Sequence, residues 1–437
     1  MKKNKKDLLI SMPHAMHVRN IMSSSFDFKT TSLIYGNFSK NISNKLKNKI
    51  KCDIKNFNFA HIAQSKLISI YSLLVDMEKD DSKNYFIKCI NKNYKSTDLP
   101  VKKIYWHKQE NILNSFLFII SKFFFFKFLL KIILIIISII IYTPTIIRYR
   151  PNKILFVCTN TFLDKGLIFI SKIYKIKLYG LINSWDHPST KRFIHIQDYQ
   201  KIFVWNDYMK KEINNIWKYS KKKIEVVGFL YFDSFFKHLK KKYITKKNII
   251  FFLPSPTMMD LKDQINVINF LTNYCLKKKI KLLVKPHPGI NQTLIKKSLQ
   301  SNKVIKWIKT KKISMNLNKT LNEKKFCDVE LIKIINESKV IINCHSTTTL
   351  DAIYFLKPVI NLCINKKYTW LYQWPYYRYI LNSNAISLAK SYNHLEILLN
   401  QYFLNENIKK TNRKKLRDKY FGDYNPKSGK LISELIK

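Results

Sequence analysis

The chain has 437 residues, and its 79 Lys and Arg outnumber its 28 Asp and Glu, which gives a formal net charge of +51 at pH 7. This length suits two domains of about 150–200 residues each. Only 7 residues are glycine, and their positions form neither GxxxxGKS/T nor GxGxxG, which argues against a P-loop NTPase and a standard dinucleotide-binding enzyme.

The positive charge comes almost entirely from lysine, because only seven of the basic residues are arginine. Proteins that read nucleic acids usually rely on arginine for two-point contacts with bases and phosphates. Lysine spread along the whole chain is typical of a solvated surface. We therefore expect no nucleic-acid partner, and an anionic membrane surface suits this charge better.

Seven cysteines lie far apart, with no CxxC pair and no Cys/His spacing typical of a metal site. A scattered set of this kind is typical of buried free thiols in a reducing compartment. We expect no bound metal and a cytoplasmic location.

Short apolar runs alternate with longer amphipathic stretches along the first half of the chain. The alternation predicts an α/β fold with a doubly wound parallel sheet. The strands expected here are 7–12, 153–160, 178–183, 201–205 and 224–228, with weaker candidates at 52–61 and 101–106, and the helices are 58–76, 165–174 and 207–219.

An apolar segment at 116–147 interrupts this pattern and is long enough to span a bilayer. Lys127 and Lys131 lie inside it and, on a helix, share one face with Ser138, which favours an amphipathic helix. Strands of one domain are expected on both sides of the segment, so a single crossing would separate them. We expect an interfacial helix, peripheral on the inner face of the cytoplasmic membrane. A buried core helix and a true span are the alternatives.

The composition changes at 237–247, where six lysines occur, and the alternation then restarts. We expect an acceptor domain at 1–236, a linker at 237–247 and a donor domain at 248–437 whose terminal helices cross back. The two domains would be Rossmann-like and face each other across a cleft. The strands expected in the second half are 248–254, 281–288, 303–308, 340–344 and 359–363, and the helices are 262–278, 329–338, 346–356 and most of 384–437.

Ligands of open parallel sheets bind beyond the carboxyl ends of the strands, so the loop after 340–344 is a candidate site. One histidine and four hydroxyl residues follow that strand: His345, Ser346, Thr347, Thr348 and Thr349. Hydroxyls and free N–H groups at a helix start can hold a phosphate without glycine, although N-capping alone also favours Ser and Thr there. Asp351 would either reach a ribose or cap the first turn.

A second candidate turn ends the strand 281–288. Two prolines bracket His287 and fix its backbone, and Lys285 adds a cation. The imidazole could stabilise charge on a departing phosphate. The alternative is a surface turn in which the histidine binds no ligand. Ser255 and Thr257, after the strand 248–254, complete the expected donor-binding residues.

The order and spacing of these turns resemble the donor-binding half of GT-B glycosyltransferases, in particular the group with an HP turn and a Ser/Thr turn. That group includes capsule transferases and CDP-glycerol glycerophosphotransferases. A second stretch resembles glycosyltransferase-like surface-carbohydrate proteins, in which SWD-N-x-T/S-x-K precedes VWN and V-x-G-x-x-x-FD. The matching residues are Ser184, Trp185, Asp186, Ser189, Lys191, Val204, Trp205, Asn206, Gly228, Phe232 and Asp233, with His187 in place of Asn.

The resemblance implies a GT-B fold and metal-independent transfer of a sugar or polyol phosphate. The donor would be a nucleotide sugar or a CDP-polyol, and the acceptor a surface polysaccharide or a lipid-linked precursor. No metal or other cofactor is expected, and no DxD pair ends a strand. His14, His17 and Asp186 are the candidates for a general base, and Arg19 for a clamp on the acceptor or a phosphate, although each could be structural.

We favour a membrane-associated transferase of cell-envelope polysaccharide synthesis, and two other functions stay open. A non-hydrolysing UDP-sugar 2-epimerase shares the fold, but those enzymes have an SGG turn followed by Glu. This chain has Ser346, Thr347 and Thr348 with Asp351 instead. A non-catalytic basic protein that binds nucleic acid is the further alternative.

Overall fold

The computed structural model describes residues 6–13, 32–36, 53–56, 58–78, 124–157, 164–185, 196–239, 243–255, 258–287, 304–308, 329–421 and 427–437, with isolated residues between 21 and 47 and at 159, 188 and 241. These residues divide into two compact units. The first unit runs to Ser234 and includes the C-terminal helix α20 (Ser428–Ile436). The second unit begins at Phe235 and includes α19 (Lys410–Phe421).

The first unit is built on a seven-stranded sheet with the order β3-β2-β1-β4-β5-β6-β7, in which every pairing is parallel. The strands are β1 (Leu8–Met12), β2 (Ser32–Gly36), β3 (Asp53–Asn56), β4 (Lys153–Phe156), β5 (Lys177–Leu181), β6 (Lys201–Val204) and β7 (Ile224–Val226). The main helices before α20 are α3 (Phe59–Glu78), α7 (Phe124–Tyr149), α8 (Gly166–Ile173) and α10 (Asp207–Trp217). The direction of strand succession reverses between β1 and β4, which is where such sheets bind ligands.

The second unit repeats this plan with six parallel strands in the order β10-β9-β8-β11-β12-β13. The strands are β8 (Asn248–Phe252), β9 (Lys281–Lys285), β10 (Ile305–Trp307), β11 (Val340–Asn343), β12 (Val359–Leu362) and β13 (Ser387–Ala389). The helices are α11 (Phe236–Leu239), α12 (Leu261–Lys278), α15 (Val329–Glu337), α16 (Thr348–Tyr354), α17 (Pro375–Asn382), α18 (Tyr392–Leu404) and α19. Its switch point lies between β8 and β11.

The fold class predicted from the sequence is confirmed, since both units are parallel α/β sheets with alternating helices. Some elements differ from the prediction. β2 and α17 were not predicted, and β13 lies in a stretch expected to be helical, where its pairing with β12 overrides the local pattern. The strand candidate at 101–106 lies outside the described residues.

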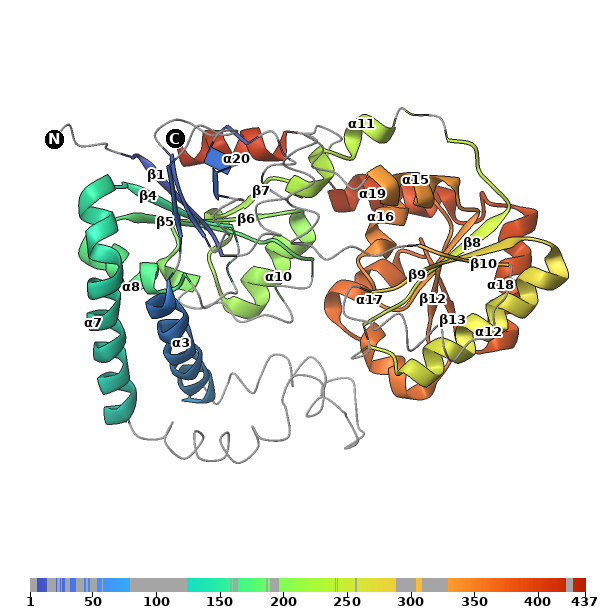
Figure 1. Cartoon of the computed structure of the whole chain (residues 1–437), viewed down its shortest axis with the longest axis horizontal. Helices are drawn as coiled ribbons and strands as arrows, with labels where there is room; N and C mark the ends of the chain where they lie inside the picture. Colours follow the sequence, from blue (N-terminus) through green and yellow to red (C-terminus); the bar gives the residue numbers. More distant parts are fainter. Residues whose placement is uncertain are drawn as a thin grey trace. The chain divides into compact units, whose positions relative to one another are not determined.

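The two faces of the first sheet carry different side chains. Successive residues of a strand point to opposite faces, so Ile10 and Met12 enter one apolar core, which α20 completes with Ile432 and Ile436. Ser11 points to the opposite face, where α3, α7 and α8 pack against one another. Figure 1 shows α7 and α3 side by side, extending away from the sheet.

Four of the residues matched to the second family segment, Trp205, Asn206, Gly228 and Asp233, have structural roles. Asn206 is the N-cap of α10 and accepts a hydrogen bond from the Met209 N–H at 2.9 Å. The Trp205 indole donates to the Ile182 carbonyl at 2.7 Å. Gly228 has a φ of 84°, a left-handed conformation that favours glycine. The Asp233 carboxylate accepts from the backbone N–H of Gly429 at 3.2 Å, which ties the start of α20 to the first unit.

Candidate functional site

Three neighbouring strands of the second sheet, β9, β8 and β11, end at the same edge and carry most of the expected donor-binding residues. Lys285 ends β9 and is followed by His287, and Ser255 follows β8. The loop 344–347 follows β11 and leads into α16. The topology therefore places these residues together at the switch point between β8 and β11. Thr257 lies outside the described residues.

His345 occupies the first turn after β11 in a left-handed conformation, with a φ of 46°. This region is uncommon for a residue with a side chain and costs about 1–3 kcal/mol. Three tyrosines hold the ring in place. It stacks on Tyr377 with a centroid distance of 4.5 Å, its Nε2 hydrogen-bonds the Tyr376 hydroxyl at 3.0 Å, and it meets Tyr372 edge to face.

The hydroxyl residues of this loop divide into two groups. Ser346 and Thr348 are half-buried and hydrogen-bond each other through their hydroxyls at 3.0 Å, and Thr347 is exposed. Thr349 is fully buried and donates to Asn343 Oδ1 at 3.0 Å, and it also bonds the Tyr377 hydroxyl at 3.2 Å. The Thr349 hydroxyl is therefore part of a buried hydrogen-bond network inside the second unit. Three of the four expected hydroxyls lie at or near the surface.

Asp351 is buried, at 8% exposure, and lies in the first turn of α16. A carboxylate near a helix start is favoured by the positive end of the helix dipole. A contact from Asp351 to a ribose stays a prediction.

The turn after β9 places a cation and an imidazole one residue apart. Lys285 is half-buried, Pro286 is buried and His287 is exposed. Desolvation by the surrounding chain lowers the pKa of His287 below its ordinary value of 6.5. The ring is therefore neutral at pH 7 and can either accept or donate a hydrogen bond.

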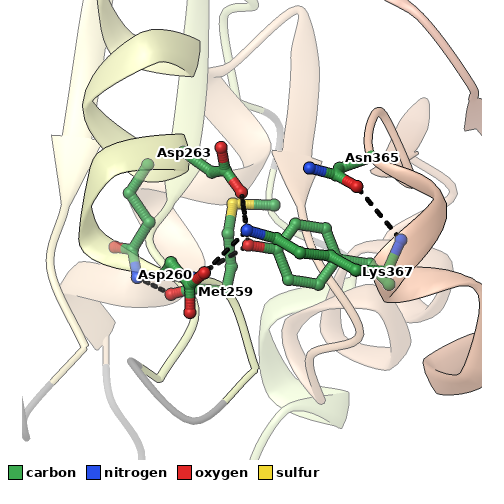
Figure 2. A network of polar contacts seen from close by, with 7 residues as sticks. Met259, Asp260, Asp263, Asn365 and Lys367 are labelled. Carbon is green, nitrogen blue, oxygen red and sulfur yellow. Dashed lines mark hydrogen bonds and ion pairs between the residues drawn. The ribbon is translucent and has the colours of Figure 1, made fainter. Parts of the chain in front are cut away.

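A polar network joins the loops that follow β8 and β12, the two strands that flank β11. Figure 2 shows Lys367 between Asp260 and Asp263, with Nζ–Oδ2 distances of 2.6 Å and 2.8 Å. The Tyr368 hydroxyl accepts from the Asp260 N–H at 3.0 Å and donates to Asp263. Burial alone would raise the pKa of Asp263, but bonds from Lys367 and Tyr368 bring it below its ordinary value. The network fixes the end of the loop that carries Ser255.

The expected catalytic residues of the first unit, His14, His17 and Asp186, lie outside the described residues, as does Arg19. The structure shows another polar pair at this unit's switch point. Asp164 and Lys165 are fully buried and joined at 2.9 Å, and the Ser11 hydroxyl donates to Asp164 at 2.7 Å. The sequence analysis missed this pair, and the adjacent Asp and Lys at the start of the helix predicted at 165–174 were the only signal for it.

Comparison with solved structures reveals proteins that align along the whole chain, UDP-GlcNAc 2-epimerases among them. The MnaA protein of S. aureus, solved with UDP, matches with 11% identity and a TM-score of 0.56, covering 99% of this chain and 96% of its own. The enzyme of Methanocaldococcus jannaschii, solved with UDP-GlcNAc and UDP, matches with 12% identity and a TM-score of 0.53, covering 99% of each chain. The Neisseria meningitidis enzyme bound to UDP-GlcNAc matches with 10% identity and a TM-score of 0.53, covering 98% of this chain and 99% of its own. No protein-family model and no curated protein sequence matches the chain.

The comparisons show that the chain has a GT-B-like fold and that the similar solved structures include UDP-GlcNAc 2-epimerases. The expectation of a polysaccharide glycosyltransferase was wrong, because UDP-GlcNAc 2-epimerases align over the full length with TM-scores of 0.53, which favours the epimerase alternative. The physical reason is that the HP turn and the Ser/Thr turn were expected only to bind a nucleotide diphosphate. Transferases and epimerases both need such a site, so these turns do not distinguish the two reactions.

Proposed function

We propose that the chain is a nucleotide-sugar epimerase that binds a UDP-sugar and inverts carbon 2 of the sugar. The observation that carries the proposal is the full-length alignment with UDP-GlcNAc 2-epimerases, two of them solved with UDP-GlcNAc bound. The alignment with these enzymes extends over both units, which suits a reaction that needs residues of each unit.

The edge formed by β9, β8 and β11 supports binding of a diphosphate. Lys285 supplies a positive charge, and Ser346 and Thr348 supply hydroxyl donors beside the start of α16. Charge-assisted bonds of this kind are about twice as strong as neutral ones. His287, neutral at pH 7, adds a donor that can be aimed by Pro286.

The difference between this loop and a glycine-rich SGG turn has a structural explanation. Thr347 has a φ of −59°, which any residue adopts, so its position requires no glycine. The left-handed position is taken instead by His345, whose ring is held by three tyrosines. The backbone turn is thus made without glycine.

Inversion of carbon 2 requires that its proton leave and that a proton return on the opposite face. The electron pair left at carbon 2 forms a double bond to carbon 1 as the nucleotide diphosphate departs, and re-addition of the diphosphate restores the bond to carbon 1. A side chain that accepts a proton and one that donates a proton must therefore lie near the sugar. We propose His14, His17 and Asp186 of the first unit for these roles, with Lys285 and His287 holding the diphosphate.

The test is incubation of the full-length protein with UDP-N-acetylglucosamine in D₂O, followed by proton NMR. Epimerisation would produce the manno isomer with deuterium at carbon 2. Binding of UDP is measured in parallel by calorimetry. His287→Ala and Ser346→Ala should weaken UDP binding at least about tenfold, equivalent to about 1.4 kcal/mol.

His394→Ala on α18 serves as the matched control, because it removes a half-exposed histidine of the same unit. A protein that binds neither UDP nor a UDP-sugar refutes the proposed site. If the protein binds UDP-N-acetylglucosamine but neither incorporates deuterium nor forms the manno product, the proposed reaction is refuted and the proposed binding site is retained.

A further inference from the structure

One long face of α7 is apolar and open to solvent. Phe125, Phe128, Ile132, Ile136, Ile140 and Ile147 follow one another along this outward face, and all are exposed, Phe125 at 73% and Ile140 at 69%. From Phe125 to Ile147 the face extends about 33 Å at 1.5 Å per residue. A continuous apolar face of this length is unusual for a surface that contacts only water.

The inward face of the same helix combines buried apolar residues, such as Leu134 and Ile146, with hydrogen-bonded polar ones. The Ser138 hydroxyl accepts a hydrogen bond from Gln64 Nε2 of α3 at 2.6 Å. Tyr142 is fully buried, and its ring meets the rings of Tyr35 and His61 edge to face. Gly166 at the start of α8 makes this close approach possible, because a Cβ there would collide with Gln64 and Tyr142.

A helix on the surface of a water-soluble protein turns its apolar stripe inward and its polar side outward. α7 differs because it is apolar on its outward face as well as on its inward face. In α7 the inward contacts include hydrogen-bonded Ser138, whereas Ile132, Ile136 and Ile140 point outward. Polar residues between helices and aliphatic residues outside are typical of helices that face lipid. The outward face is therefore suited to a hydrocarbon environment.

The charges of the helix indicate the kind of lipid. The sequence of α7 contains basic residues and no Asp or Glu. Lys131, Arg148 and the following Arg150 are exposed. The whole chain, α7 included, has a formal net charge of +51. Basic groups beside an apolar face gain about 1 kcal/mol each near an anionic lipid surface.

We propose that the outward face of α7 docks the first unit onto an anionic lipid bilayer. The helix lies against the bilayer with one face and against the protein with the other. α7 packs along α3 and α8, and β4, which begins four residues after its end, pairs with β1 in the same sheet. This arrangement keeps the sheet on one side of the bilayer. The inference goes beyond the proposed epimerase reaction and does not depend on it.

Flotation of the full-length protein with lipid vesicles tests the proposal. The vesicles contain phosphatidylcholine alone or with about one third phosphatidylglycerol. The variant that combines Ile132→Asn, Ile136→Asn and Ile140→Asn should reduce vesicle partitioning at least about tenfold. Lys131→Gln with Arg148→Gln should reduce partitioning only on the anionic vesicles, and the reduction should shrink at high salt.

The matched control substitutes three similarly exposed aliphatic residues of the second unit: Leu276→Asn, Ile397→Asn and Leu404→Asn. It should float like the unsubstituted protein, and circular dichroism should show that both triple variants are folded. Failure of the unsubstituted protein to float overturns the proposal, as does unchanged flotation of the α7 variant. A dimer in light scattering that the α7 variant converts to a monomer, without vesicle binding by either, would assign the face to a second copy and also overturn it.

Discussion

Acid should destabilise the first unit through His61, which lies on α3 and is 3% exposed. Burial, with a smaller contribution from the positive charge of Lys55, lowers its pKa from 6.5 to about 4. The neutral ring bonds the Tyr35 hydroxyl through Nε2 and Asn58 Oδ1 through Nδ1. Protonation would therefore place a charge in a buried polar layer beneath α7.

The sign follows from the order of the two pKa values. Between about pH 6.5 and about 4 the unfolded chain binds this proton more readily than the folded chain. The free energy of unfolding therefore decreases as the pH falls through this window. The decrease is about 2 kcal/mol between pH 7.5 and 5, and about 3 kcal/mol by pH 4.

The perturbation is His61→Gln, which keeps a hydrogen-bonding side chain and removes the titration. Hydrogen exchange of β1 and β4 amides in urea, followed by mass spectrometry, measures the free energy of unfolding of this unit. The variant should lose about 2 kcal/mol less than the unsubstituted protein between pH 7.5 and 5. His394→Gln in the second unit is the control. Parallel pH dependences for the protein and the His61 variant would refute the reasoning.

Three further substitutions test other parts of the structure. Thr349→Val removes a hydroxyl from a buried hydrogen-bonded cluster and should lower the free energy of unfolding in urea by about 1–3 kcal/mol. Thr349→Ser keeps the hydroxyl and should retain most of this free energy, so an equal loss in both variants would exclude the hydroxyl as the cause. Gly429→Ala places a Cβ against the backbone of Phe26 and should displace α20 and lower Tm, whereas an unchanged Tm would show that the neighbouring chain yields freely. Asp263→Asn removes one of the two carboxylates that hold Lys367. Amide exchange at the start of α12 should be faster in this variant than in the control variant Asp418→Asn, and equal exchange rates in the two variants would show that the network does not fix this loop.

The parallel sheets were predictable because their inner strands are continuous apolar runs. Val340–Asn343 and Lys153–Phe156 read as buried strands from composition alone. β13 was missed because its three residues, Ser387–Ala389, are too short and mixed to show a pattern, and because its pairing partner β12 is distant in the sequence. α17 was missed because its many aromatic residues have no strong helix preference.

The candidate site was predictable as far as strand order determines it. Residues directly after β9, β8 and β11 had to meet at one edge, so Lys285, His287 and Ser346 could be grouped without coordinates. The internal role of Thr349 could not be foreseen, because it depends on Tyr377, 28 residues away. The proposed reaction could not be inferred either, since a turn suited to a diphosphate can serve several chemistries.

The placement of α20 affects how the chain is made. The first unit contains both β1, at the beginning of the chain, and Ile432 and Ile436, near its end, in one apolar core. β1 emerges from the ribosome long before α20, and the whole second unit is synthesised between them. One apolar face of the first sheet therefore stays incomplete during synthesis until α20 emerges. Loss of α20 would therefore expose a core whose other residues were synthesised much earlier.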